Sequence, residues 1–239
     1  MASDDGYPAA LERGHALFPG IRIGRPGRAR TYWLTIAAMR LLRLRWAVTV
    51  TGSEHVGAGP AIIVGNHVSA MDPVAAVMTH WWRVTAFTKA EVFAKRGAIF
   101  FRLMGQIPLR RGDEEATSWA MGMAALSLAH GGKLGLYPEG TRSPDKRSLH
   151  RLHKRILIPV IEANPDVPVH AIVTTYPGRR HGRIRIQVSL SPRLALDPRT
   201  MSADEITEAV RQALVTLGDL DYVDEYARDV KARRAAEQP

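Results

Sequence analysis

Two patterns of hydrophobic and polar positions recur along this chain, and together they predict strands interleaved with helices. Short apolar runs, often β-branched, that end in glycine or polar residues are typical of buried strands. Longer runs rich in alanine, leucine and methionine, without proline, are typical of helices. We therefore predict strands at residues 48–51, 61–64, 133–137, 167–174 and 183–190, and helices at residues 74–81, 113–130 and 203–217.

Local signals support this assignment. Asp72 and Pro73 precede the helix at 74–81, and aspartate is favoured at the N-cap while proline is favoured at the first helical position. Gly131 and Gly132 follow the helix at 113–130 and end it. Strands that alternate with helices predict an α/β fold, a single layered domain with a mixed, mostly parallel sheet flanked by helices.

The two ends of the chain lack this regular alternation. Residues 1–30 are rich in Gly, Pro and Arg, which predicts an irregular N-terminal arm. Residues 31–46 combine apolar bulk with tryptophans and late arginines, as in an amphipathic helix that lies either on a membrane surface or in the core. One large folded domain is expected at 47–222, followed by a polar tail at 223–239.

Composition limits the possible partners and locations. The chain has 239 residues and a formal net charge of +10, which indicates an anionic partner such as nucleic acid, a membrane surface or a phosphorylated substrate. It has no cysteine, which excludes disulfides and a thiolate nucleophile. The first residues are acidic and polar, unlike a secretory signal. Arginines interrupt the longest apolar stretch before the ~20 residues that a spanning helix needs. We expect no transmembrane helix and a peripheral protein at the cytoplasmic face of a membrane.

The segment NHVSAMD at residues 66–72 offers the first candidate chemistry. His67 and Asp72 are five residues apart and are not on one helix face, so a turn after the strand at 61–64 must bring them together. A carboxylate bonded to one ring nitrogen fixes the tautomer and leaves the other nitrogen as a general base. The plainer alternative is a structural hydrogen bond and an ordinary N-cap.

The chain offers no clear nucleophile to complete a serine-hydrolase triad. A Gly-x-Ser-x-Gly motif is absent, and Ser69 is too close to His67 in sequence to be assigned that role. We therefore expect His67 to activate a hydroxyl of the substrate directly.

Two further turns carry arginines. The segment GQIPLRR at 105–111 ends in Arg110 and Arg111, and paired arginines suit a phosphate monoester, although a solvated basic turn is the alternative. The segment YPEGTRS at 137–143 follows a predicted strand, and its Pro and Gly favour a turn. Glu139, Thr141 and Arg142 can converge there on one polar site.

Taken together, these segments resemble the lysophospholipid acyltransferase family, specifically the 1-acylglycerol-3-phosphate acyltransferases. NHVSAMD, GQIPLRR and YPEGTRS match three family blocks in order, and KAEVF, which begins at Lys89, matches a fourth stretch. The likeness covers roughly residues 45–220 and departs from the family after the third block, where the chain has LHKR at 152–155.

The resemblance implies a glycerol-3-phosphate acyltransferase-like fold and transfer of a fatty acyl group to a lysophospholipid hydroxyl. The donor would be acyl-CoA or acyl carrier protein, with no cofactor, metal or covalent acyl-enzyme. His67 would be the base and Asp72 would orient it. The residues implied to bind the acceptor are Arg110, Arg111, Glu139, Gly140, Thr141 and Arg142, with Asn66, Ser69 and Lys89 in supporting roles.

Three alternatives stay open at this point. The same chemistry could act on another lysophospholipid or a glycolipid. A hydrolase would direct His67 at water, and a non-catalytic basic module would bind a membrane without using His67 at all. A purely basic binding surface has no need of the histidine and aspartate spacing, so we expect an anionic membrane as partner and no nucleic acid.

Overall fold

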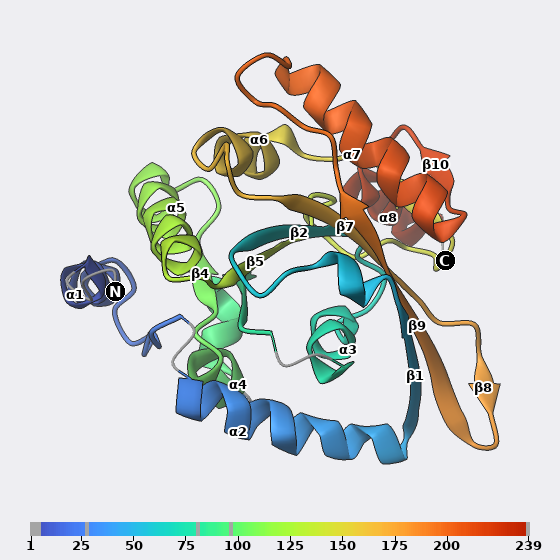
Figure 1. The fold of residues 1–239 in the computed structure, drawn as a ribbon, viewed down its shortest axis with the longest axis horizontal. Helices are drawn as coiled ribbons and strands as arrows, with labels where there is room; N and C mark the ends of the chain where they lie inside the picture. Colours follow the sequence, from blue (N-terminus) through green and yellow to red (C-terminus); the bar gives the residue numbers. More distant parts are fainter. Residues whose placement is uncertain (1–5, 27–28, 80–81, 96–97, 238–239) are drawn as a thin grey trace.

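The computed structural model describes residues 6–26, 29–79, 82–95 and 98–237, and its core is a twisted sheet between layers of helices (Figure 1). The main sheet contains β1 (Trp46–Thr51), β2 (Ala61–Gly65), β3 (Val84–Lys89), β4 (Ile107–Leu109), β5 (Lys133–Leu136), β7 (Val169–Thr175), β8 (Arg179–Arg180) and β9 (Arg183–Arg193). A separate small sheet pairs β6 (Ser148–His150) with β10 (Asp221–Val223).

The helices predicted from the apolar runs are present, and others appear at both ends of the chain and between the predicted elements. The α-helices are α1 (Gly6–Leu17), α2 (Ala29–Arg40), α3 (Asp72–Thr79), α4 (Ala98–Leu103), α5 (Glu114–Ala129), α6 (Lys154–Glu162), α7 (Ala203–Gly218) and α8 (Ala227–Ala236). Short 3-10 helices are η1 (Leu41–Leu44), η2 (Ser53–His55) and η3 (Ala90–Ala94).

The main sheet has the strand order β1-β9-β7-β2-β5-β3-β4, with β8 paired to the start of β9. Its neighbouring strands are parallel except for the pairs β7 with β9 and β8 with β9. The prediction of a mixed, mostly parallel sheet flanked by helices is therefore confirmed.

Strand direction decides which segments meet. The carboxyl ends of β2, β3, β5 and β7 lie at one edge of the sheet, where ligands bind in open α/β sheets. Since β9 is antiparallel to β7 and β1 is parallel to β9, the amino ends of β1 and β9 lie at this edge too. We call it the carboxyl edge.

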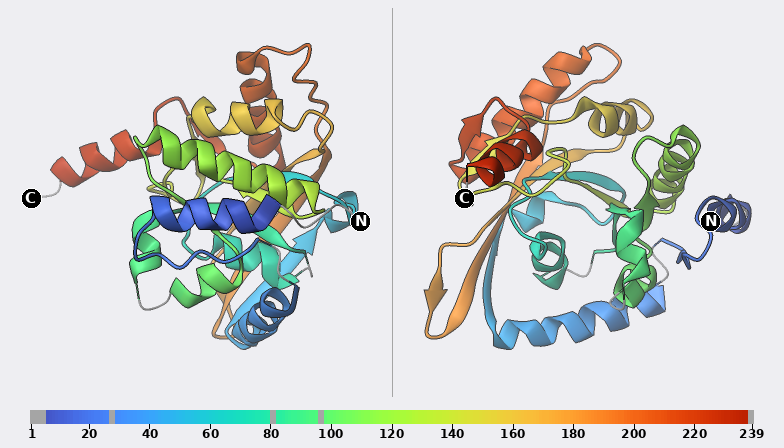
Figure 2. Two further views of the ribbon diagram at one scale, coloured as in Figure 1. Left: turned by 90° about the vertical axis from the view of Figure 1, so that its left-hand side faces the viewer. Right: turned by 180° about the vertical axis from the view of Figure 1, so that it is seen from behind.

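The two faces of the sheet are buried under different helices. The strand β2 is buried at every position, as its unbroken apolar run predicts. Ile62 and Val64 belong to the larger core cluster with α5, α6 and α7, whereas Ala61 and Ile63 belong to a second cluster that includes Ala75 of α3. Figure 2 shows these helices on opposite sides of the sheet, with α1 outside α5.

The N-terminal segment is more ordered than predicted. Residues 6–17 of the expected irregular arm form α1, which packs on α5. Tyr7 of this helix and Phe18, the residue directly after it, are buried. The indole Nε1 of Trp119 donates to the Ala10 carbonyl at 2.6 Å. Proline and glycine in the segment suggested irregular structure, but tertiary contacts with α5 stabilise the helix.

The predicted helix at 31–46 is shorter than expected. The α-helix α2 ends at Arg40, η1 follows, and Trp46 is already the first residue of β1. Leu34, Leu41 and Leu44 are more than two thirds exposed. The strand predicted at 48–51 accordingly begins earlier. In the described part of the chain, no helix has the length and hydrophobicity needed to cross a bilayer.

Two other boundaries differ. The expected polar tail at 223–239 contains the helix α8, anchored by buried Ala227 and Val230. The helix predicted at 74–81 begins earlier, at Asp72, and its last predicted positions, 80 and 81, lie outside the described residues.

Gly14→Ala tests the docking of α1. A Cβ at this position would lie 2.3 Å from the Trp119 ring, so the helix or the indole must move. Overpacking of this kind costs about 1–3 kcal/mol, and urea unfolding should show a lower midpoint. The control is Gly122→Ala in α5, where a Cβ meets nothing within 4 Å. Equal midpoints for the two variants would show that α1 does not contribute this packing.

Candidate active site

His67 and Asp72 lie at the carboxyl edge, just beyond the end of β2, and they are in contact. Nδ1 of His67 is 3.0 Å from Oδ2 of Asp72. The Asp72 side chain is fully buried, whereas that of His67 is 21% exposed. The turn at 66–72 thus brings the two residues together, as the spacing predicted, with the histidine on the accessible side.

The Asp72 carboxylate has several other donors. Oδ2 accepts the backbone N–H groups of Val68 and Ser69, each at 2.8 Å, and Oδ1 accepts the Tyr176 hydroxyl at 2.7 Å. The carboxylate therefore faces the preceding turn and not the amides of its own helix, so the predicted N-cap role is wrong. Because a carboxylate only accepts, a neutral imidazole at His67 has its proton on Nδ1 and its lone pair on Nε2.

Two tyrosines complete the surroundings of the pair. Besides the Tyr176 bond, the Tyr137 ring lies 4.6 Å from the His67 ring, centroid to centroid. Burial and the neighbouring Asp72 raise the pKa of both phenols, which keeps them as neutral hydroxyls. We did not single out either side chain from sequence. The signal that could have identified them is their position, because Tyr137 follows β5 and Tyr176 follows β7, the two neighbours of β2.

Glu139 joins the first and third motifs. It is fully buried, and its oxygens accept the backbone N–H groups of His67 at 2.8 Å and His150 at 3.1 Å. Burial raises its pKa to about 7, which the two amides oppose and the charges of Asp72 and Asp145 reinforce. The resemblance implied that Glu139 binds the acceptor. Its bonds to these amides instead assign it a structural role.

Other motif residues hold the backbone in place. The Asn66 side chain is buried and exchanges two hydrogen bonds with the Thr174 backbone, at 2.9 and 3.1 Å. The Ser69 hydroxyl accepts the Met71 N–H at 3.1 Å. Gly140 has φ +67°, and a Cβ there would lie 2.9 Å from the His153 ring. These contacts fit supporting roles for Asn66 and Ser69, and they explain the glycine by geometry.

The paired arginines of the second motif have different surroundings. Arg110 bonds to Asp113 at 3.0 Å and to the Leu17 carbonyl at 3.1 Å, and its guanidinium lies over the Phe18 ring. These contacts hold Arg110 at the junction of α1 and α5. Arg111 instead donates to the Gly140 carbonyl, so only the second arginine reaches the third motif.

Two predicted cations lie free at the carboxyl edge. Arg142 is exposed, and the N–H of the next residue, Ser143, donates to the His67 carbonyl at 2.5 Å. Lys89 ends β3 and is also exposed. Neither side chain has an acidic partner in the described ranges. Thr141, between Gly140 and Arg142, is half-buried.

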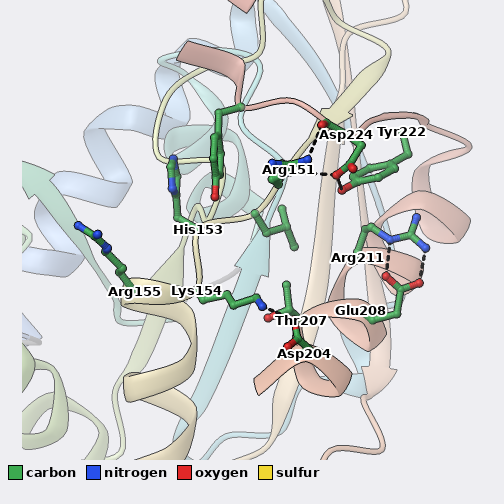
Figure 3. A pocket seen from close by; sticks show the side chains of 12 residues that line it. Arg151, His153, Lys154, Arg155, Asp204, Thr207, Glu208, Arg211, Tyr222 and Asp224 are labelled. Atoms are coloured by element: carbon green, nitrogen blue, oxygen red, sulfur yellow. Dashed lines mark hydrogen bonds and ion pairs between the residues drawn. The ribbon is translucent and has the colours of Figure 1, made fainter. Parts of the chain in front are cut away.

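A separate cavity of about 550 Å³ lies between the start of α6, the helix α7 and β10 (Figure 3). Three of its cations are paired with carboxylates: Arg151 with Asp224 at 2.9 Å, Lys154 with Asp204, and Arg211 with Glu208. Its lining includes neither member of the His67 and Asp72 pair. We therefore locate the candidate active site at the carboxyl edge and not in this cavity.

Glu139→Gln should destabilise the protein, because an amide offers one acceptor oxygen to two buried N–H groups. An unpaired buried N–H costs about 1–3 kcal/mol. The pKa of Glu139 is raised from 4.5 to about 7, so its contribution to stability is present below pH 4.5 and is lost as pH rises through 7. The stability difference between wild type and variant, measured by urea unfolding, should be larger at pH 5 than at pH 8. A difference independent of pH would contradict the raised pKa.

Comparison with known proteins agrees with this geometry. The sequence pattern of the family described as Acyltransferase matches residues 47–175. Among solved structures, the chain is similar to the 1-acyl-sn-glycerophosphate (LPA) acyltransferase PlsC from Thermotoga maritima. The TM-score is 0.59 at 21% identity, over 95% of this chain and 88% of that one. The search of curated proteins found no match.

The solved structure supports the fold, and the family match covers both the histidine turn and the third motif. The matched segment is more than half of the chain and contains His67, Asp72 and Glu139. The prediction of an acyltransferase is therefore confirmed at the level of the family, and this chain belongs to the acyltransferase family.

Proposed function

We propose that the protein transfers a fatty acyl group from acyl-CoA, or from acyl carrier protein, to the free hydroxyl of 1-acylglycerol-3-phosphate, giving phosphatidic acid. The observation that carries this proposal is the contact of His67 with buried Asp72, which leaves the partly exposed imidazole as a base. Free cations beside it suit an acceptor that bears a phosphate.

The reaction needs no covalent intermediate on the protein. Nε2 of His67 removes the proton of the acceptor hydroxyl as that oxygen attacks the thioester carbonyl carbon. The resulting tetrahedral intermediate collapses, the carbon–sulfur bond breaks, and the thiolate leaves with the proton that His67 held. Asp72 stabilises the imidazolium between the two transfers, and the hydrogen bonds to Val68, Ser69 and Tyr176 hold that carboxylate in place.

Cations from three segments lie at the same edge of the sheet as the histidine, which suits recognition of a phosphate. Arg142 is connected to His67 through the Ser143 backbone, Lys89 ends a strand at the same edge, and Arg111 contacts the Gly140 carbonyl. Arg110 is engaged by Asp113 and the Leu17 carbonyl, so we assign it a structural role. The neighbour in Thermotoga maritima is named for an acceptor of this phosphate-bearing class.

Membrane association is proposed from the position of exposed apolar side chains. Leu41 and Leu44 directly precede β1, whose amino end lies at the carboxyl edge, so a lipid surface beneath them would also face His67. Exposed Arg179 and Arg180 in the hairpin before β9 lie at the same edge. Leucines flanked by arginines are suited to an anionic bilayer surface, where an acceptor with an acyl chain resides.

His67→Ala should lower kcat by about 10²–10⁴-fold, because general-base catalysis contributes that much. The measurement uses purified enzyme, labelled acyl-CoA and a panel of acceptors that includes 1-acylglycerol-3-phosphate and other lysophospholipids. The control is His181→Ala, in the exposed hairpin turn. Turnover of another acceptor alone, or release of fatty acid without any acceptor, would overturn the proposed function.

Leu44→Glu should weaken binding to vesicles of phosphatidylglycerol and phosphatidylcholine. Burial of a leucine side chain contributes about 1.5–3 kcal/mol, so affinity should fall roughly tenfold or more. Ala195→Glu introduces the same charge at another exposed position and serves as the control. Vesicle sedimentation measures both variants, and equal binding by the two would contradict a lipid-binding role for Leu44.

A further inference from the structure

The C-terminal helix α8 is fixed against the loop that carries Arg142. At its start, the Tyr226 ring stacks on the His153 ring, with centroids 4.3 Å apart and planes within 3°. At its end, Arg234 pairs with Asp145 at 3.6 Å. Ala227 and Val230 of the helix are also buried. These contacts hold α8 alongside the segment that follows the third motif.

Lys231 lies on the side of α8 that faces this loop. It is three residues before Arg234, about one helical turn, and so shares a face with the residue that contacts Asp145. It is half-buried, and burial lowers the pKa of its ammonium. The charges of Arg142 and Lys89 lower that pKa further, while Glu139 opposes them, which agrees with a position at the carboxyl edge.

The pairing of cations within α8 sets Lys231 apart. Arg228, Arg233 and Arg234 each form an ion pair, with Asp229, Glu225 and Asp145 respectively. Lys231 has no acidic partner within the described ranges, and the same is true there of Arg142 and Lys89. Three cations from three separate elements thus lack a neutralising carboxylate in the described ranges, and the charges of two of them, Arg142 and Lys89, act on the third.

We propose that Lys231 is a third cation of the acceptor's phosphate site, supplied by the C-terminal helix alongside Lys89 and Arg142. The inference rests on the proposed function and extends it to the last helix of the chain. A phosphate monoester carries a charge of about −1.5 to −2 at neutral pH and has three acceptor oxygens. A cluster of one guanidinium and two ammonium groups can donate to each of these oxygens and neutralise that charge.

This arrangement gives Lys231 a role in selectivity and none in the acyl transfer itself. It would strengthen binding of an acceptor with a terminal phosphate monoester relative to a monoacylglycerol, which has no charge to pair. Because Lys231 does not reach the hydroxyl that reacts, its loss should raise KM for the phosphorylated acceptor and leave kcat nearly unchanged.

Kinetics of Lys231→Gln in the full-length enzyme test this role. Loss of a hydrogen bond to a charged group should raise KM for 1-acylglycerol-3-phosphate by about tenfold or more, with monoacylglycerol unaffected. Lys231→Arg keeps the charge and should restore most of the loss. The control is Arg233→Gln, which removes the same charge from the opposite face of α8 and should leave KM unchanged.

A binding measurement separates this inference from the proposed function. Inorganic phosphate should raise the Tm of wild type and raise that of Lys231→Gln much less, whichever phosphate-bearing acceptor the enzyme uses. An unchanged KM together with an unchanged response to phosphate would overturn the role of Lys231 alone. If wild type responds to phosphate through Lys231 but does not acylate 1-acylglycerol-3-phosphate, the proposed acceptor is wrong and the phosphate site stands.

Discussion

The carboxylate of Glu139 is buried between the turn that carries His67 and the small sheet that contains His150, and it gives one oxygen to the backbone of each. Burying an acidic group is unfavourable unless hydrogen bonds compensate, and here the compensation comes from the backbones of two separate segments. A single side chain thereby couples the first motif to the third. The loop with Arg142 joins Glu139 to β6, and α8 follows β10, the strand that pairs with β6, so the same connection helps to position both.

In the pair of His67 and Asp72, the carboxylate is fixed and buried, whereas the imidazole is accessible. Asp72 is saturated by the imidazole, two amides and a phenol, whereas His67 keeps one ring nitrogen unused by that network. Strand direction makes this possible, because Tyr137 and Tyr176 directly follow β5 and β7, the strands that flank β2. Because neighbouring parallel strands end at the same edge of a sheet, residues about a hundred positions apart in sequence meet there.

Much of this arrangement could be predicted from the sequence, and the failures have physical reasons. Buried strands and the pairing of His67 with Asp72 follow from local patterns that burial and turn geometry enforce. The orientation of the Asp72 carboxylate could not be predicted, because donors from Val68 and Tyr176 compete with the helix amides. The helices α1 and α8 were missed since their stability comes from contacts with distant residues such as Trp119 and His153. Arg110 looks equivalent to Arg111 in sequence, and only the tertiary contacts of Arg110 with Leu17, Phe18 and Asp113 distinguish the two.

The connection between α2 and the first strand of the sheet is very short. The helix α2 leads directly into η1, and only Arg45 lies between η1 and the first residue of β1. Two hydrogen bonds from β9 hold this junction. The Arg183 guanidinium donates to the Trp46 carbonyl, and the Ile184 N–H donates to the Arg45 carbonyl. A short, hydrogen-bonded connection of this kind fixes the orientation of α2 relative to the sheet. In the proposed membrane-bound state, the surface that binds the exposed leucines would therefore also set the tilt of the sheet and the height of His67 above that surface. A lipid acceptor would then reach His67 by diffusion within the plane of the membrane.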